Sequence, residues 1–407
     1  MSRSSEEHVL VFFGGTSAEA EVSVVSGTAI AEALLDRNVH VLQVLVARDG
    51  EAALLPSLHH RGGRSPQMYT ASTAGTELTC TFEPLDALLA RIAHEHVDLV
   101  AIPALHGPGD EDGEVQVALA RHGIPFVGAA HAAARLGMEK HQFKALVHAL
   151  GLPTLPYLLV TRQEWAADQS AARARVAAFA AEHTDGGALI GKPTAHGSSI
   201  GMRIARGESE WPEAIELALS FGDVALLEPY LERPRELEVA LLEYPDGRVE
   251  ALGPGEVFSG REFYDYDAKY LPGVSRTTTS ADIPHALRAE LHAVATQLFT
   301  ASGCRDLARI DFLLARTGSR ADAWFISEIN TFPGFTPISL YPALAEAAGI
   351  GFADLCLQLV ATARARGGAA RDRSHQGRHQ LAYGRGWPAH VNALALRHHL
   401  VEVRRPA

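Results

Sequence analysis

The chain has 407 residues and a formal net charge of −12, from 36 Lys and Arg against 48 Asp and Glu. This acidic balance argues against a nucleic-acid partner, whereas the 47% hydrophobic and 21% charged residues are typical of a soluble protein with two or three domains. The three cysteines lack CxxC spacing and no apolar run is long enough to span a bilayer, so we expect no disulfide framework, zinc site or membrane partner, and a cytoplasmic location.

The first part of the chain predicts an α/β domain. Residues 8–13 (HVLVFF) read as a buried strand, and a small-residue loop and a helical pattern over residues 21–35 follow. Further buried strands are predicted within residues 40–50 and 97–107. Residues 56–80 are rich in Pro, Ser, Thr and Gly and predict an inserted loop or a short hairpin.

Two polar residues of this domain are candidates for substrate contact. Glu21 begins the predicted helix, where a carboxylate is favourable in any case and could instead hold a substrate ammonium. His106 ends the strand of residues 97–107, at the edge where open α/β sheets place ligand-binding groups. A lone His is more often structural, so both interpretations stay open from these residues alone.

The middle of the chain predicts a pocket for an anion. Residues 186–192 match most of a P-loop, but Pro193 stands where Ser or Thr should bind a metal ion. We therefore predict a strand that delivers Lys192 to a pocket. The loop GSSIG (197–201) then offers small residues and N–H donors to phosphate.

The neighbouring segments carry further candidates. Residues 130–150 predict a helix that contains Lys140, and residues 223–244 predict two strands that contain Glu228 and Glu236. Residues 261–273 are dense in tyrosine, and surface tyrosine clusters more often pack than react. The Thr- and Ser-rich continuation, residues 275–280, nevertheless suits a flap that closes over a site.

Near the carboxyl end a hairpin is predicted from ARIDFLLA (308–315) and AWFISEIN (323–330), which flank a polar loop. If the register sets Asp311 opposite Glu328, it also sets Arg309 opposite Asn330, because residues two apart share a face. Two carboxylates and an amide oxygen gathered in this way suit Mg²⁺, although a solvated hairpin face is the alternative.

Beyond residue 363 the composition becomes basic and rich in His. A partly disordered extension is the simplest interpretation, with an oligomer contact or a weak metal-binding tract as alternatives.

Six motifs, in the same order, resemble the D-alanine–D-alanine ligases of the ATP-grasp superfamily over roughly residues 8–360: GGTSAEAEVSVVSG, LHGPGDEDGEVQ, GMEK, KPTAHGSSIG, EFYDYDAKY and ARIDF…EINTFPGFTPISL. The resemblance implies a three-domain α/β fold with the nucleotide between two sheets. The implied parts are an N-terminal open parallel-sheet domain (1–129), a central subdomain (130–235), a catalytic subdomain (236–362) and the basic extension (363–407).

The implied activity is ATP-dependent ligation for peptidoglycan precursor synthesis. ATP phosphorylates the carboxylate of a first D-alanine, and the amine of a second D-alanine attacks the acyl phosphate. The resemblance also implies two Mg²⁺ ions, for which Mn²⁺ could substitute, and a homodimer that binds small molecules.

Roles at the nucleotide and metal sites follow from the same resemblance. The implied ATP-binding residues are Lys140, Lys192, Ser199, Glu228, Leu231, Glu236 and Lys269. The three lysines would contact phosphates, Glu228 and Leu231 the adenine, and Glu236 the ribose. The implied metal ligands are Asp311, Glu328 and Asn330.

Roles at the amino-acid sites are implied as well. Glu21 would anchor the first ammonium and His106 the neighbouring carboxylate, while Ser339 and Leu340 would receive the second carboxylate. The implied catalytic residues are Glu21, Ser198 and Tyr270, which form a hydrogen-bond triad, and Arg309 and the Gly334 N–H, which stabilise the oxyanion. Tyr270 favours an amine over D-lactate as the nucleophile.

The chain departs from the family pattern at four positions. Asp110 replaces a glycine, Glu139 replaces Asp, His196 stands where an acidic residue is common, and Pro229 replaces a frequent Lys. These departures leave open the same chemistry with D-Ser or another amino acid as acceptor, including a dipeptide ligase of specialised metabolism.

Overall fold

The computed structural model describes residues 4–55, 80–258, 275–316 and 322–383. Contacts divide the chain into one compact unit of residues 1–365 and a second unit that begins at residue 366. The described residues form three sheets, all in the first unit, and the expected α/β class is confirmed.

The N-terminal sheet has the strand order β4-β3-β2-β1-β5. The strands β1 (Ser4–Gly14), β2 (His40–Val46) and β5 (His96–Pro103) are parallel, as expected. The short strands β3 (Glu51–Leu54) and β4 (Glu83–Pro84) add an antiparallel edge that the parallel-sheet expectation did not include. The reason is local, since Gly50 at a φ of 87° closes a tight turn after β2, and a tight turn joins antiparallel strands only.

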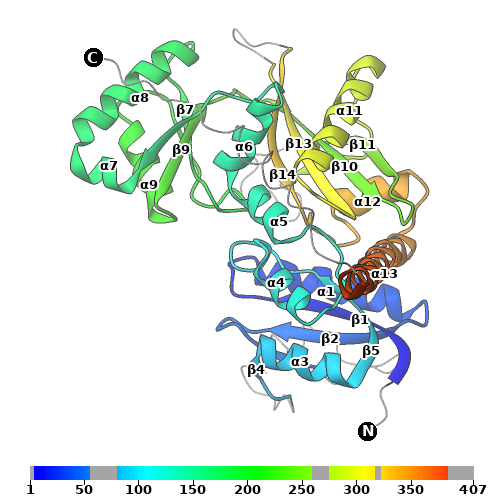
Figure 1. Ribbon diagram of the computed structural model, residues 1–407. Coiled ribbons are helices and arrows are strands. Elements are labelled where there is room, and N and C mark those ends of the chain that lie inside the picture. Colours follow the sequence, from blue (N-terminus) through cyan, green and yellow to red (C-terminus); the bar gives the residue numbers. More distant parts are fainter. Residues whose placement is uncertain (1–3, 56–79, 259–274, 317–321, 384–407) are drawn as a thin grey trace. The chain divides into compact units, whose positions relative to one another are not determined.

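Both faces of this sheet are buried. In β1, Val9, Val11 and Phe13 belong to the core on the side of α1 (Ala20–Leu35). Leu10 and Phe12 belong to the core on the side of α3 (Leu85–Glu95) and α4 (Glu114–Arg121). Figure 1 shows α1 and α3 on opposite faces of β1 and β2. A continuous apolar run such as HVLVFF follows from burial on both faces.

The helix-prone stretch 130–150 folds as two helices, α5 (His131–Met138) and α6 (Lys140–Ala149). Glu139 leaves the helical region, with a φ of −84° and a ψ of 89°. The break has a tertiary cause, because the Lys140 N–H donates to the Thr194 carbonyl at 2.9 Å rather than to the preceding turn.

The central sheet is antiparallel with the order β6-β9-β7-β8. Its strands are β6 (Leu158–Thr161), β7 (Leu189–Pro193), β8 (Arg203–Ala205) and β9 (Val224–Pro229). The helices α7 (Arg162–Ala167), α8 (Gln169–His183) and α9 (Trp211–Ser220) supply apolar side chains to its core. Figure 1 shows α9 against β7 and β9, and the apolar side chains of the three helices cover one face of this sheet.

The C-terminal sheet is antiparallel with the order β12-β11-β10-β13-β14. Its strands are β10 (Arg235–Glu243), β11 (Val249–Phe258), β12 (Arg276–Thr278), β13 (Leu307–Leu314) and β14 (Trp324–Asn330). One face packs on α5, α6 and α11 (His285–Ala301). In β13, Ala308, Ile310 and Phe312 point into that core, so the alternate residues Arg309 and Asp311 point to the opposite face.

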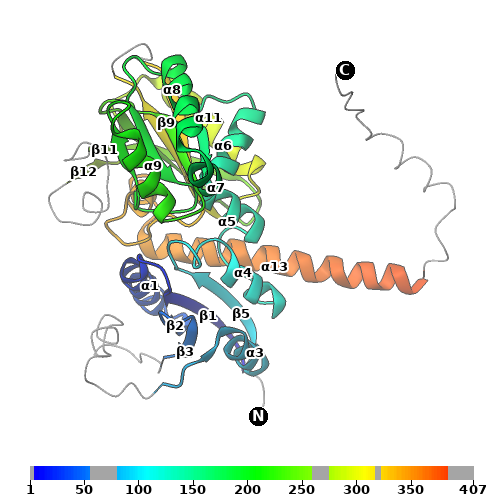
Figure 2. The same cartoon turned by 90° about the vertical axis from the view of Figure 1, so that its left-hand side faces the viewer.

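Two helices close the described chain, α12 (Leu340–Ala347) and α13 (Phe352–Tyr383). Figure 2 shows α13 as one unbroken helix, and it runs past the boundary expected at residue 362. Among the described residues no single helix is long and apolar enough to cross a membrane, and only α12 together with residues 352–368, bent by 98°, passes by length and composition.

Candidate active site

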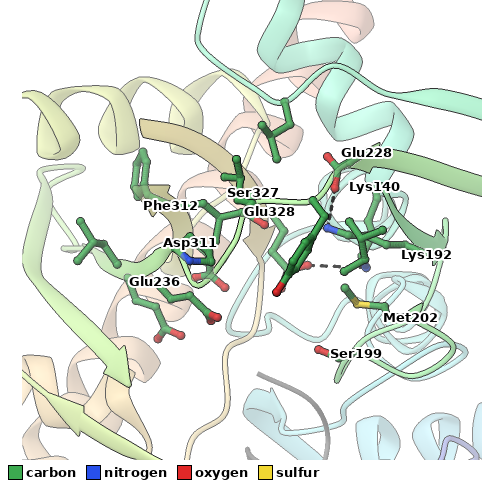
Figure 3. A pocket seen from close by; sticks show the side chains of 18 of the residues that line it. Lys140, Lys192, Ser199, Met202, Glu228, Glu236, Asp311, Phe312, Ser327 and Glu328 are labelled. Atoms are coloured by element: carbon green, nitrogen blue, oxygen red, sulfur yellow. Dashed lines mark ion pairs between the residues drawn. The ribbon is translucent and has the colours of Figure 1, made fainter. Parts of the chain in front are cut away.

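A pocket lies between the central and C-terminal sheets (Figure 3). It is lined from β7 and the loop after it, from the β9–β10 connection, and from β13 and β14. Every described residue that the sequence assigned to ATP lines this pocket: Lys140, Lys192, Ser199, Glu228, Leu231 and Glu236. Lys269, the seventh, lies outside the described residues.

The hairpin register has the predicted pairs. Asp311 lies opposite Glu328 and Arg309 lies opposite Asn330. A bulge that the sequence did not reveal follows at once, because Phe312 pairs with Ile326 and leaves Ser327 as the extra residue. The bulge lets Ile326 and Ile329, three positions apart, both enter the core while Glu328 faces the pocket.

Arg309 supplies a positive charge on the wall of the pocket that β13 and β14 form. Its Nε and Nη2 donate to Asp311 at 2.7 and 2.8 Å, and its Nε lies 3.1 Å from Glu238 Oε2. Burial alone would lower the pKa of Arg309, but the carboxylates of Asp311 and Glu238 raise it well above its ordinary value. The guanidinium is therefore a permanent cation beside Asp311, one of the three candidate metal ligands.

The residues at this wall fit a hard cation. Asn330 Oδ1 is buried and accepts no hydrogen bond from any described residue, so it is available as a ligand. Two carboxylates and one amide oxygen are the donor types that Mg²⁺ prefers when phosphate and water complete its shell. The described parts of the chain contain no cluster of three or more His, Cys, Asp or Glu side chains arranged for a metal.

Glu228 lies between two lysines. Its Oε2 is 2.6 Å from Lys192 Nζ, and its Oε1 pairs with the ammonium of Lys144. Burial opposes the ionisation of Glu228, but the two ammonium groups outweigh it and hold the pKa of this carboxyl at about 2. Sequence reasoning assigned no role to Lys144, which lies one helical turn after Lys140.

The phosphate-binding loop predicted at residues 197–201 borders the same pocket. Lys140 Nζ donates to the His196 carbonyl at 2.5 Å and lies 3.7 Å from Glu328. Ser198 and Ser199 both have positive φ, 48° and 57°, which is uncommon outside glycine and fixes an unusual loop path. The loop is thus attached to the wall that carries the candidate metal ligands.

The structure corrects the expectation for Glu21. The Ser198 hydroxyl donates to Oε1 of Glu19, which is buried, whereas Glu21 is exposed on the first turn of α1. The physical reason is the helix rotation, because two residues turn a side chain through about 200° at 3.6 residues per turn. The described contact of Ser198 is therefore with Glu19 rather than with Glu21, and Tyr270, the third residue of the expected triad, lies outside the described residues.

Asp110, one of the departures, supports the loop that leads to Glu19. Its Oδ2 accepts hydrogen bonds from the N–H groups of Thr16 and Ser17, each at 2.8 Å. Gly15 has a φ of 110°, and a Cβ there would lie 2.5 Å from Asp110 Oδ2, so the approach requires glycine. Asp110 in this way holds the segment after β5 to the loop between β1 and α1.

His106 and Glu111 are neighbours in the first domain, with His106 Nδ1 3.9 Å from Glu111 Oε2. His106 is buried with Nε2 3.2 Å from Ser26 Oγ, and burial lowers its pKa to about 4. Burial and the charge of Glu19 raise the pKa of Glu111 to about 8. His106 is thus a neutral hydrogen-bonding group at neutral pH rather than a cation.

The residues expected to meet the second substrate lie at the start of α12. Ser339 is the N-cap residue of α12 but makes no side-chain capping hydrogen bond, and its Oγ accepts from the Thr336 N–H at 3.1 Å. Leu340 is buried, and a Cβ on Gly334 would lie 3.4 Å from Ser339 Oγ. Gly334 therefore lies close to Ser339, which directly precedes Leu340.

Comparison with known proteins agrees with these features. A family model described as D-ala D-ala ligase N-terminus matches residues 8–129, and one described as D-ala D-ala ligase C-terminus matches residues 146–361. A D-alanine–D-alanine ligase of Corynebacterium aurimucosum is 35% identical over 379 residues, which cover 90% of this chain and 100% of the relative. One from Streptomyces coelicolor is 36% identical, with 88% and 93% covered.

Solved structures are similar as well. The D-alanyl-alanine synthetase A of Vibrio cholerae has a TM-score of 0.69 at 27% identity, with 89% of this chain and 99% of that chain covered. The VanG D-Ala:D-Ser ligase of Enterococcus faecalis has a TM-score of 0.73 at 24% identity, with 88% and 99% covered, a likeness that speaks for the fold alone. The fold, the order of the motifs and the relatives agree: the chain belongs to the D-alanine–D-alanine ligase family of ATP-grasp enzymes.

Proposed function

We propose that the chain joins two D-alanines in an ATP-dependent reaction through a D-alanyl phosphate intermediate. The observation that carries the proposal is the pocket in which the predicted nucleotide residues meet the Asp311–Glu328 pair and Arg309. An amide does not form from a free carboxylate without activation, and this pocket brings groups for nucleotide, cation and developing negative charge together.

The nucleotide would lie between the two sheets. The base would meet Glu228 and Leu231, and the ribose would meet Glu236 beyond them. Lys140 and Lys192 would contact phosphates beneath the Ser199 loop, and we retain Lys269 for the same role on the strength of the family resemblance. Asp311, Glu328 and Asn330 would hold Mg²⁺, which when bound would neutralise phosphate charge during transfer.

The first D-alanine would bind at the first domain. Glu19 would take the ammonium, in place of Glu21, because it is buried and already contacts the Ser198 loop. His106 would donate a hydrogen bond to the carboxylate, since the neutral imidazole has one N–H to give. The carboxylate oxygen then attacks the γ-phosphorus of ATP, ADP leaves, and the acyl phosphate remains.

In the second step the amine of the second D-alanine attacks the acyl carbon. Arg309 and the Gly334 N–H would stabilise the tetrahedral oxyanion, and inorganic phosphate leaves as the amide forms. Ser339 and Leu340 would orient the acceptor by its carboxylate. Because the reaction consumes ATP and yields a cell-wall precursor, we assign it to the cytoplasm.

The test is ADP release with D-alanine alone, followed by trials of D-Ser, D-lactate and L-amino acids as second substrates. We expect turnover with D-alanine alone and a dipeptide product detectable by mass spectrometry. Turnover that requires D-Ser would replace the acceptor but keep the chemistry. No turnover with any pair that contains D-alanine would refute the proposal.

A further inference from the structure

The chain uses lysine at very few positions. Its 36 basic residues comprise 32 arginines and four lysines, which are Lys140, Lys144, Lys192 and Lys269. Three of these are the proposed phosphate contacts, and Lys144 has no role in the function proposed above. Arginine and lysine are not interchangeable, because a guanidinium is planar and large whereas an ammonium is compact. A lysine in an arginine-rich chain therefore points to a place that needs a compact cation.

The surroundings of Lys144 fit that requirement. The residue is 3% exposed and its ammonium pairs with Glu228. Its Nζ also donates to Thr154 Oγ1 at 2.8 Å, and that hydroxyl donates to the Ile326 carbonyl at 3.2 Å. The Tyr157 ring centre lies 5.9 Å away. Thr154 thus connects the Lys144 ammonium to β14, and Lys144 contacts Glu228 without lining the pocket itself.

Glu228 has both oxygens committed to cations. Lys144 pairs with Oε1, and Lys192 lies 2.6 Å from Oε2. Only Lys192 and Glu228 of the three line the pocket (Figure 3). An ionised carboxylate accepts hydrogen bonds and donates none, so Glu228 offers the pocket an acceptor of fixed orientation.

We infer that Lys144 is a positioning residue that sets the choice of nucleobase by orienting the Glu228 carboxylate. Adenine carries an exocyclic amino group, which an acceptor attracts, and guanine carries a carbonyl oxygen at the same position, which an acceptor repels. Discrimination then comes from the unfavourable contact as much as from the favourable one. The inference rests on the proposed function, which places the base at Glu228.

The test is to measure the dissociation constants of ATP and GTP by calorimetry, each with Mg²⁺. Amino acids are left out, so that the identity of the acceptor substrate does not affect the result. We expect the wild type to prefer ATP. In Lys144→Met the ratio of the two affinities should fall by about tenfold or more, because Glu228 loses the charged partner that fixes it. Thr154→Val keeps the shape of the side chain, removes the hydroxyl that holds the ammonium, and should lower the ratio by a smaller factor.

The control is Arg175→Met, which removes a cation from an exposed ion pair with Glu164 at 2.7 Å and should leave the ratio unchanged. If Lys144→Met fails to fold, Thr154→Val decides the matter. Weaker binding of both nucleotides with an unchanged ratio would mean that Lys144 is only structural, and would overturn the inference while the proposed function stands. A wild type that binds no ATP would overturn both.

Discussion

The Ser198 hydroxyl donates a hydrogen bond to Glu19, although the two residues are 179 positions apart in the chain. Ser198 belongs to the loop over the nucleotide pocket, and Glu19 precedes the first helix of the N-terminal domain. This contact links the proposed nucleotide and first-substrate sites, and the first prediction follows from it.

Glu19→Gln should reduce kcat/KM for the first D-alanine by about 100-fold, because an ammonium would lose its charged partner in a buried site. Glu21→Gln is the matched control, since Glu21 is exposed two residues further along the chain. It should stay within about twofold of the wild type. Initial rates at varied D-alanine decide between the two glutamates, and the opposite ranking would restore the original assignment to Glu21.

Gly197→Ala tests how closely the loop and the first domain approach. A Cβ at Gly197 would lie 2.9 Å from Glu19 Oε2, so the methyl group should displace the carboxylate and lower kcat/KM by about tenfold. The control is Gly207→Ala, where a Cβ meets nothing within 4 Å. Equal activity of the two variants would show that the loop moves without cost.

Asp311→Asn should reduce Mg²⁺-dependent ADP release by about 100-fold and raise the Mg²⁺ concentration needed for half-maximal rate. The carboxylate is a proposed metal ligand, and its loss also leaves Arg309 with one carboxylate fewer. Asp223→Asn, at an exposed ion pair, is the control. Near-normal activity of Asp311→Asn over a Mg²⁺ titration would remove this residue from the metal site.

Glu111 predicts a stability change with pH. Its pKa is raised from 4.5 to about 8 on folding, so the folded state holds the proton more tightly than the unfolded state does. The contribution of Glu111 to the free energy of unfolding is therefore largest below its unfolded pKa, and it is lost as the pH rises through about 8. Glu111→Gln should abolish that loss and, without nucleotide, melt a few degrees above the wild type at pH 9. If the melting temperatures of the two proteins changed in parallel from pH 5 to pH 9, the prediction would be wrong.

The parts of the fold that sequence predicts well are those set by neighbouring residues. The pairing of Asp311 with Glu328 follows from strand alternation once a register is assumed, and two short strands allow few alternative registers. Pro193 excludes a continuing P-loop helix and so predicts a strand at Lys192, which β7 confirms.

The sequence-based predictions that were wrong concern features that depend on contacts between residues far apart in the chain. The break at Glu139 is caused by the hydrogen bond from the Lys140 N–H to Thr194, and the contact that favours Glu19 over Glu21 comes from Ser198. Neither partner can be read from local pattern. Lys144 was overlooked although a signal existed, namely the scarcity of lysine in the chain.

That scarcity also makes the chain suited to chemical probing. An amine-selective reagent can modify only the terminal amino group and four side chains. Two of those side chains, Lys140 and Lys192, line the proposed nucleotide pocket, and a third, Lys144, is buried and does not line it. Loss of labelling in the presence of a ligand would therefore report occupancy of one place in the molecule, without an engineered tag.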